Sequence, residues 1–346
     1  KVYPFCGRTC QLFINESLDA QEVKQYFPVD RVIAGVLKVY QSLLGVTFRE
    51  VQGGSLWHRD VRLYEITDPE DGGFKAHFYL DLHPREGKFS HAAAFNLLKG
   101  RAGTNGYDSA ASAIVANFSK PSPGKPALMS HDEVLTLFHE FGHVMHHTLT
   151  RARHLSFSGS AVARDFVEAP SQMMENFAWE KEVLTEVSGH WETGEPLPAP
   201  LLDKMIAARR FNMGLSTLRQ IALASADMAL FSLVPKDPSA TFNEVYARVM
   251  GNPLPPGSNM AASFGHLLGG YGAGYYGYYY SLVGAQDIYS MFTRPDSVRS
   301  ETGRRYRRTV LEPGSEVPES DSLKNFLGRE PSEDAFMRMF EDAPSS

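Results

Sequence analysis

Helical periodicity is the first regular feature of the chain and covers residues 20–44. Apolar residues recur there at spacings of three and four, as at Ile33, Val36 and Tyr40, which is typical of an amphipathic helix. Pro28 interrupts the pattern, and proline disfavours a helix interior. The pattern therefore predicts two helices that pack on a core.

An alternating pattern follows, in residues 61–66 and 75–82, which predicts two half-buried strands. The acidic and glycine-rich segment 68–73 between them has the residue types of a hairpin turn. A third apolar run, residues 113–118, could pair with the same strands. Surface loops are expected where glycine, proline and serine accumulate, at residues 100–106 and 119–126.

Beyond Ser130 the helical period returns and continues for most of the chain. The predicted helices cover residues 131–151, about 170–187, 200–233 and 241–250. We therefore expect a mainly α fold with one small sheet within about residues 55–120. Residues 1–19 show no periodicity, so we expect an irregular N-terminal segment followed by one folded region, residues 20–346.

Composition excludes several classes of function. Of the 346 residues 43% are hydrophobic and 21% charged, as in a globular protein, and the net charge of -6 leaves no broad basic face for nucleic acid. No uninterrupted apolar run is long enough to span a membrane, and no secretory signal is present, so we expect an intracellular protein without a membrane partner. Cys6 and Cys10 are too few for a disulfide framework or a four-cysteine zinc site, and we expect two free thiols. Since the chain starts at Lys1 rather than methionine, we expect further sequence upstream.

The strongest chemical signal lies in the helix predicted after Ser130. Residues 130–133 match a capping box, in which serine and glutamate bond the free amides of the first helical turn. The same helix contains His139-Glu140-Phe141-Gly142-His143. His139 and His143 lie one turn apart on one face, so both imidazoles can reach one zinc ion. Glu140 is turned aside from that line, where it could act as the base that deprotonates zinc-bound water.

A third ligand is needed, because three fixed positions arise by chance in many unrelated chains. The third histidine of the extended H-E-x-x-H-x-x-G-x-x-H pattern would fall at Leu149, and the glutamate of another peptidase class at Val162 or Ala163. None of these side chains binds zinc. The first carboxylates downstream are Asp165 and Glu168, and the spacing alone leaves both open.

Three segments carry a specific family resemblance. They are HEFGHVMH at residues 139–146, FSG at 157–159 and DFVEAPSQMMEN at 165–176, and they resemble the thimet oligopeptidase and neurolysin family of zinc metallopeptidases. The resemblance implies that Glu168 is the third ligand of one Zn²⁺ per chain. It also implies a zincin-type helical catalytic domain with a small β-sheet, formed here by residues 20–346.

Other polar residues near the motif have less definite assignments. Glu175 lies seven residues after Glu168 on the same helical face, where it could orient a zinc ligand by a hydrogen bond or simply face solvent. No metal role is expected for His146 and His147, because three ligands already suffice.

A second segment, residues 264–280, combines six glycines with six tyrosines and His266. So many glycines would destabilise a buried helix or strand, which predicts a mobile loop. From composition alone, such a loop could donate hydrogen bonds to an oxyanion or form an aromatic cluster on a neighbouring helix. A similar segment in the family implies that His266 and Tyr278 stabilise the oxyanion.

The same resemblance extends to other residues of this segment. It implies that Tyr271 and Tyr275 contact the substrate. The family usually has aspartate at Gly272 and often a polar residue at Gly274, so we expect a looser loop here. His91 begins a stretch that in the family lies near the sheet edge beside the cleft, although an ordinary strand would look the same.

The resemblance, from about Gln21 to about Phe340, implies a zinc-dependent endopeptidase that hydrolyses internal bonds of short peptides. We expect a cytoplasmic monomer and leave a mitochondrial form open. The family's N-terminal half, which forms the other wall of its substrate channel, has no counterpart here. The chain could therefore be the C-terminal part of a longer protein or a short form, and the alternative function is a weakly active or inactive peptide-binding or regulatory protein.

Overall fold

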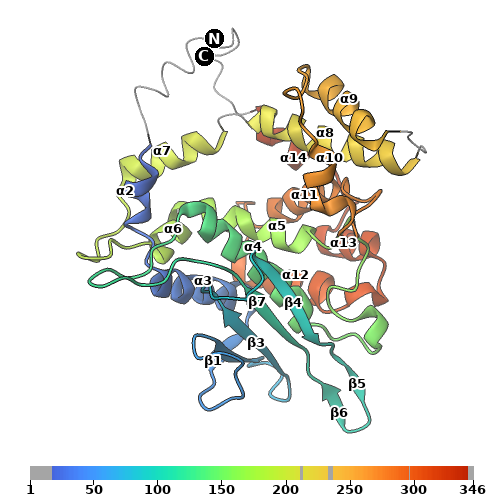
Figure 1. Cartoon of the computed structure of the whole chain (residues 1–346). Coiled ribbons are helices and arrows are strands. Elements are labelled where there is room, and N and C mark those ends of the chain that lie inside the picture. The colour runs from blue at the N-terminus through green and yellow to red at the C-terminus, as the bar shows by residue number, and fades with distance from the viewer. Residues whose placement is uncertain (1–17, 211–212, 233–236, 296, 342–346) are drawn as a thin grey trace.

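The computed structural model describes residues 18–210, 213–232, 237–295 and 297–341. Cys6, Cys10 and almost all of the segment predicted to be irregular lie outside these residues. The fold is mainly α, with a small sheet below a stack of helices (Figure 1). This arrangement confirms the mainly α class with a small sheet.

Two helices open the described chain, as the periodicity predicts. They are α2 (Ala20–Lys24) and α3 (Val29–Leu44). Pro28 is the N-cap of α3, and Gly45, with a left-handed φ of 67°, ends it. The Tyr40 hydroxyl of α3 donates a 2.6 Å hydrogen bond to the Phe138 carbonyl, so α3 packs against the helix that carries the histidine motif.

The main sheet has five strands in the order β1-β2-β3-β7-β4. Their bounds are β1 Thr47–Glu50, β2 Arg62–Thr67, β3 Lys75–Asp81, β4 Ala93–Leu98 and β7 Ala111–Val115. Strands β2 and β3 form the expected antiparallel hairpin, and β7 pairs with β3 in parallel. Strand β1 was not predicted, and β4 is a strand that begins two residues after His91.

The predicted loop at residues 100–106 is partly wrong. Strands β5 (Arg101–Gly103) and β6 (Gly106–Asp108) pair there as a short antiparallel hairpin. Gly103 and Gly106 pair on either side of the two-residue turn, and Gly106, with a φ of 129°, takes a backbone conformation that favours glycine.

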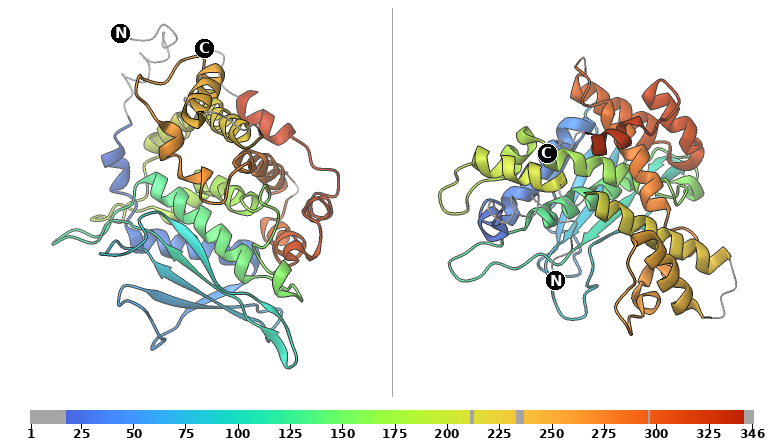
Figure 2. Two further views of the ribbon diagram at one scale, coloured as in Figure 1. Left: turned by 45° about the vertical axis from the view of Figure 1, so that its right-hand side comes forward. Right: turned by 90° about the horizontal axis from the view of Figure 1, so that it is seen from above.

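Helix α4 (His131–Thr148) crosses the centre of the molecule and carries the histidine motif (Figure 2). Its capping box is confirmed: Ser130 accepts the Glu133 amide, and the Glu133 carboxylate accepts the Ser130 amide. Phe141 packs edge-on against Tyr40 of α3 and Phe78 of β3, with ring centroids 4.7 Å and 5.0 Å apart. The apolar face of α4 is therefore fixed between α3 and the sheet.

The remaining helices follow α4 in the chain. They are α5 Ala169–Glu175, α6 Lys181–Val187, α7 Ala199–Arg210, α8 Met213–Ser232, α9 Pro238–Met250, α10 Met260–Ser263, α11 Gly277–Ser290, α12 Arg299–Tyr306, α13 Glu319–Leu327 and α14 Asp334–Glu341. The helix predicted over about 170–187 is two helices, because the 3-10 helix Asn176–Trp179 separates α5 from α6. No helix among the described residues is long and apolar enough to cross a membrane.

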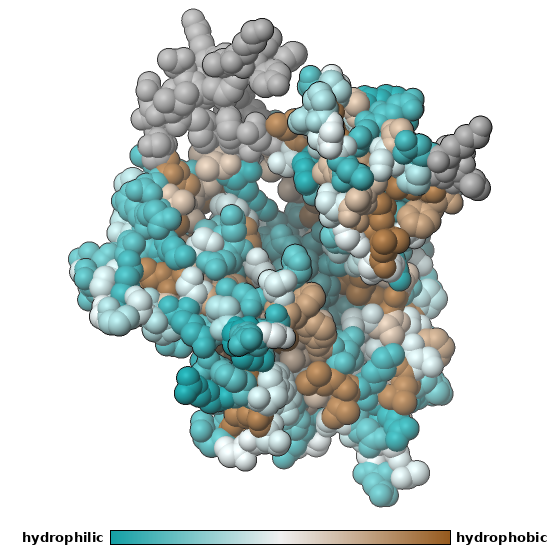
Figure 3. Space-filling view, in the orientation of Figure 1, coloured by the Kyte–Doolittle hydropathy of each residue, from teal (hydrophilic) through white to brown (hydrophobic). Residues whose placement is uncertain are grey.

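Helices α8, α9 and α10 form a lobe at the upper right of Figure 1, which we call the α8–α10 lobe. It has its own small core, which includes Leu223, Phe242 and Tyr275 and is separate from the main core around α4. The surface is hollowed between this lobe and the rest of the molecule, above α5 (Figure 3). Side chains from both parts therefore border one hollow.

Candidate functional site

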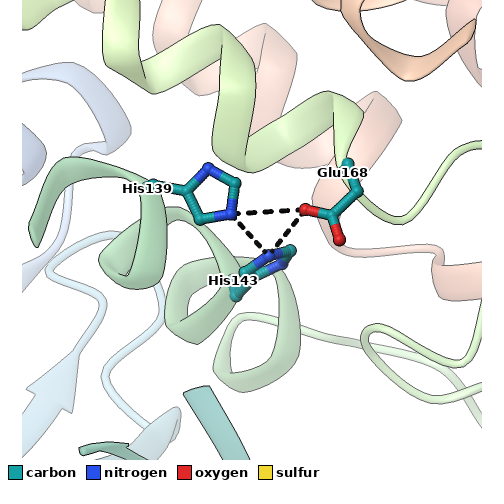
Figure 4. Close-up of side chains that lie close together, drawn as sticks. All are labelled: His139, His143 and Glu168. Carbon is teal, nitrogen blue, oxygen red and sulfur yellow. Dashed lines mark hydrogen bonds and ion pairs between the residues drawn. The ribbon is translucent and has the colours of Figure 1, made fainter. Parts of the chain in front are cut away.

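Three side chains from α4 and the start of α5 converge on one point (Figure 4). His139 Nε2 lies 3.2 Å from His143 Nε2 and 3.3 Å from Glu168 Oε2. His143 Nε2 lies 3.1 Å from the same Glu168 oxygen. The three atoms form a nearly equilateral triangle, and they are a group that could hold a metal ion.

The size of this triangle fits a zinc ion. In a tetrahedral zinc site with bonds of about 2.0–2.1 Å, neighbouring ligand atoms are about 3.3 Å apart. The three observed separations, between 3.1 Å and 3.3 Å, match that length. Two imidazoles and one carboxylate are also the protein ligands of many catalytic zinc sites, which keep a fourth position open.

Gly142 allows α4 and α5 to approach closely enough to form the triangle. A Cβ atom at Gly142 would lie 2.7 Å from Ser171 Cα and 3.4 Å from the Pro170 carbonyl oxygen. The first of these distances is shorter than any ordinary contact, so only glycine fits between the two backbones. Since Glu168 directly precedes α5, the same approach brings its carboxylate to the histidines.

The structure distinguishes the two carboxylates that the spacing left open. Asp165 accepts a 2.8 Å hydrogen bond from the Tyr276 hydroxyl, and its carbonyl accepts another from Ser281. Glu168 is buried, with 5% of its surface exposed, and contacts both histidines. Geometry therefore brings Glu168, and not Asp165, into the triangle.

Glu175, at the end of α5, reaches the other nitrogen of His139. Its Oε1 lies 2.7 Å from His139 Nδ1, so it fixes the ring and leaves Nε2 directed into the triangle. Burial disfavours a charged His139, but hydrogen bonds with Glu168 and Glu175 outweigh it and raise the pKa to about 10. Burial likewise opposes ionisation of Glu168, yet hydrogen bonds with the two histidines lower its pKa well below the usual range.

The other polar residues of α4 differ in their surroundings. Glu140 is buried, with 8% of its surface exposed, and directly follows His139. His147 Nε2 lies 2.8 Å from the Leu98 carbonyl oxygen on β4. His146 is fully buried, and neither ring nitrogen has a hydrogen-bond partner among the described residues. Burial lowers the pKa of His146 to about 3, which keeps this imidazole neutral.

The glycine-rich segment is a loop only in part. Residues 264–276, which we call the tyrosine loop, include the short 3-10 helix Gly265–Leu267, but Tyr278 lies in the first turn of α11. The Tyr271 hydroxyl donates a 2.9 Å hydrogen bond to Glu168 Oε1, and its ring stacks on Tyr278 at 4.9 Å. His266 packs against both rings at 5.7 Å. The predicted oxyanion donors thus lie together beside Glu168.

Burial shifts the pKa values of His266, Tyr271 and Tyr278 so that their uncharged forms are favoured. Burial and the charge of Glu168 raise the pKa of Tyr271 to about 12. Burial, with Tyr271 and Glu168 as neighbours, raises the pKa of Tyr278 far above its ordinary value. Burial also lowers the pKa of His266. At neutral pH both tyrosines keep their hydroxyl protons and His266 is uncharged.

Tyr275 of the tyrosine loop contacts α8. It is 8% exposed, and its hydroxyl donates a 2.8 Å hydrogen bond to Gln220 Oε1 of α8. Together with Tyr278, Ile221 and Met228 it lines a cavity of about 470 Å³ between α8 and α11. Any contact of Tyr275 with a substrate would therefore be made through this largely apolar cavity.

Two glycines of the tyrosine loop have neighbours in the space that a side chain would fill. A Cβ atom at Gly272 would lie 2.6 Å from the Phe231 ring of α8, and one at Gly274 would lie 2.9 Å from Arg164 Cδ. The Arg164 guanidinium also lies over the Tyr271 ring, 5.1 Å from its centroid. The sequence predicted a looser loop without these contacts, because they come from residues distant in the sequence.

Sequence reasoning missed the residues that hold the tyrosine loop. Gln220 and Phe231 belong to a segment in which periodicity indicated only a helix, and Arg164 precedes the carboxylates that were weighed as ligands. The sequence pattern gives little indication of such contacts, since each contact links segments that are far apart in the chain.

Comparison with known proteins gives consistent matches. Residues 5–342 match the model of "Peptidase family M3". The chain is 43% identical over 328 residues to the thimet-like oligopeptidase of Dictyostelium discoideum, an alignment that covers 93% of this chain and 49% of that protein. It is 39% identical over 331 residues to oligopeptidase A of Escherichia coli (strain K12), with 94% and 48% covered. The chain spans about half the length of the curated relatives it matches.

Solved structures share the fold at low identity. A carboxypeptidase of Pyrococcus furiosus superposes with a TM-score of 0.54 at 14% identity, over 99% of this chain and 65% of that one. A putative oligoendopeptidase F superposes with a TM-score of 0.52 at 14% identity, over 76% of this chain and 42% of that one. These likenesses confirm the expected fold, a helical domain with a small sheet.

Replacement of Gly142 by alanine is predicted to separate α4 from α5. The added Cβ would meet the Ser171 backbone, so we expect a loss of about 1–3 kcal/mol in unfolding free energy and weaker zinc binding. Urea unfolding and zinc competition titration measure the two effects. Gly284→Ala is the matched control, because its Cβ would lie 3.9 Å from Ala169 Cβ, an ordinary contact. Equal effects of both variants would contradict the close-approach argument.

His146→Leu is predicted to reduce the sensitivity of the fold to acid. Because the pKa of His146 falls from 6.5 to about 3 on folding, the unfolded chain binds the extra proton between these values. This residue therefore lowers stability progressively as the pH falls below 6.5 and has no such effect above it. Urea unfolding at pH 8 and pH 5 should show a smaller stability loss in the variant than in the wild type. The prediction would be wrong if the loss of stability between pH 8 and pH 5 were the same in the variant and in the wild type.

Proposed function

The chain belongs to peptidase family M3, and from this premise we propose that it is a zinc metalloendopeptidase that hydrolyses internal bonds of short peptides. One observation carries the proposal: the triangle formed by His139, His143 and Glu168 has the donor set and the dimensions of a catalytic zinc site. Tyr271 and Tyr278, which we call the tyrosine pair, lie beside the triangle and carry hydroxyl groups on the side of Glu168.

His139, His143 and Glu168 would hold the zinc ion, and Glu175 would orient the His139 ring from behind. When bound, the ion would lower the pKa of a water molecule and polarise the carbonyl of the scissile peptide bond. Three protein ligands leave a position for that chemistry, which a fourth protein ligand would block.

Glu140 is the proposed general base. It follows His139 on α4, so it would lie beside the ion without ligating it. Its burial removes competing bulk water from the carboxylate. In the proposed reaction Glu140 accepts a proton from the attacking water and later delivers it to the nitrogen of the leaving amine.

Tyr278 and His266 are the proposed oxyanion donors. When water attacks the carbonyl carbon, negative charge develops on the carbonyl oxygen and is stabilised by preorganised donors. The raised pKa of Tyr278 keeps its hydroxyl proton available, and the lowered pKa of His266 makes it a neutral N–H donor. Tyr271 holds the Tyr278 ring by stacking while its own hydroxyl bonds Glu168.

Substrate binding is proposed in the hollow between the α8–α10 lobe and the rest of the molecule. Tyr271 would contact the peptide directly, since it borders the triangle. Tyr275 would act through the 470 Å³ cavity, whose lining by Ile221, Met228 and tyrosine rings suits an apolar side chain. Short peptides fit this arrangement best, because an unstructured chain can enter a hollow that a folded protein cannot.

The alternative function is a weakly active or inactive peptide-binding or regulatory protein. Reacting groups misplaced by about 1 Å can lose about a hundredfold in rate, so a site with the right residues could bind a peptide without cleaving it efficiently. Zinc content and peptide cleavage, measured together on the purified chain, decide between the two functions.

Glu140→Gln is predicted to retain zinc and lose activity. Glutamine keeps the shape of the side chain but cannot accept the proton, so kcat should fall by about 10²–10⁴ while KM changes little. Metal analysis and cleavage of quenched fluorescent peptides of increasing length test this. Stoichiometric zinc in the wild type, with no cleavage above that of the variant, would favour the peptide-binding alternative.

Tyr278→Phe is predicted to lower kcat by about 10²–10³ by removing one oxyanion donor. The phenyl ring preserves the stack on Tyr271, so zinc content and thermal stability should be unchanged. Tyr289→Phe is a suitable control, because Tyr289 lies on the same helix and its hydroxyl bonds Glu180. Equal kcat values for the Tyr278 variant and the wild type would contradict the assigned role.

A further inference from the structure

A buried carboxylate on α8 binds the backbone of the tyrosine loop. Asp227 has no exposed surface. Its Oδ1 accepts the Ala273 amide at 3.0 Å, and its Oδ2 accepts the Tyr275 amide at 3.0 Å. Each carboxylate oxygen thus binds a different amide of the same turn.

The backbone conformation of the loop allows both of these hydrogen bonds. Ala273 has a φ of 56° and is the one non-glycine residue with positive φ among the described residues. Left-handed backbone is unfavourable for alanine. A residue in this conformation can turn nearby amides toward one anion, the geometry known as a nest. The two hydrogen bonds to Asp227 offset the unfavourable conformation of Ala273.

Helix α8 fixes Tyr275 at both ends. Its amide is bound by Asp227, and its hydroxyl by Gln220, seven residues earlier and on the same face of α8. The Tyr275 ring in turn contacts His266 and Tyr278, at 5.1 Å and 5.2 Å. A displacement of Tyr275 would therefore move both proposed oxyanion donors.

The other side of the segment is bound to the metal-site helices. The Tyr271 hydroxyl donates to Glu168, and the Gln172 side chain donates a 3.1 Å hydrogen bond to the Tyr278 carbonyl oxygen. The intervening residues include Gly272 and Gly274, which by themselves restrict the backbone little. The position of the tyrosine pair is thus determined by contacts at both ends.

We propose that Asp227 is a positioning residue for the hydrolytic reaction. Its carboxylate anchors the tyrosine loop to α8 and thereby holds Tyr278 and His266 at the place where the oxyanion forms. Asp227 does not touch the substrate. This assignment rests on the proposed function, and it predicts an effect on the chemical step rather than on peptide affinity.

Asp227→Asn tests the assignment with almost no change of shape. An amide side chain offers one acceptor oxygen, and its NH₂ group would face the other backbone N–H, so one of the two bonds is lost. Asp237→Ala is the control, because Asp237 caps α9 in the same lobe by accepting the Ala240 amide. That variant loses one exposed carboxylate–amide bond at the start of α9, in the same lobe.

Two measurements on the full chain test the assignment, and two more check that the fold is retained. Hydrogen–deuterium exchange of residues 264–280 reports how firmly the loop is held, whether or not the protein is active. Steady-state cleavage of a quenched fluorescent peptide by the zinc-loaded protein separates kcat from KM. Zinc content and thermal unfolding of each variant show whether the fold is retained.

We expect Asp227→Asn to exchange faster in residues 264–280 and to lose at least about tenfold in kcat, with KM within about twofold. Asp237→Ala should match the wild type in both measurements. Equal kcat values for the two variants, or unchanged loop exchange in Asp227→Asn, would overturn the assignment. If the wild type cleaves no peptide, the proposed function fails, and the exchange measurement alone still decides whether Asp227 anchors the loop.

Discussion

The close packing of α4 against α5 at Gly142 is the contact on which the rest of the site depends. Residues of α4 supply His139, His143 and Glu140, but a metal site also needs a ligand from a second element. A Cβ atom at Gly142 would lie 2.7 Å from the Ser171 backbone, so the absence of a side chain sets the distance between the helices. Glu168 then completes the triangle, and Glu175, two turns later on the same face of α5, orients His139.

The candidate site combines side chains from two cores. The metal triangle belongs to α4 and α5 and is supported by the main core, whereas Tyr275 packs in the core of the α8–α10 lobe. The tyrosine loop joins them, with Tyr271 bonded to Glu168 and the backbone bonded to Asp227. The position of the metal triangle relative to the proposed oxyanion donors therefore depends on how the lobe packs on the rest of the molecule.

Much of the fold follows from local sequence signals. Apolar periodicity predicted α3, the hairpin β2–β3 and α4, and the capping box at Ser130 marks the start of α4. Strand β1 and the hairpin β5–β6 were missed, since both are very short and their pairing depends on partners elsewhere in the chain or on a glycine turn. Tyr278 was expected in a mobile loop, but contacts with α5 and α8 allow a helix to begin at Gly277 despite the surrounding glycines.

For the site itself, the sequence determined the pair His139 and His143, because two residues four apart on a helix must share a face. It also limited the nearest downstream carboxylates to Asp165 and Glu168, and family resemblance favoured Glu168. Only the tertiary structure decided that Glu168 contacts the histidines and that Asp165 bonds Tyr276. It also decided that Asp227 binds the backbone of the tyrosine loop. The physical reason is that these contacts join separate elements, and their distances are set by packing between backbones rather than by the period of any one helix.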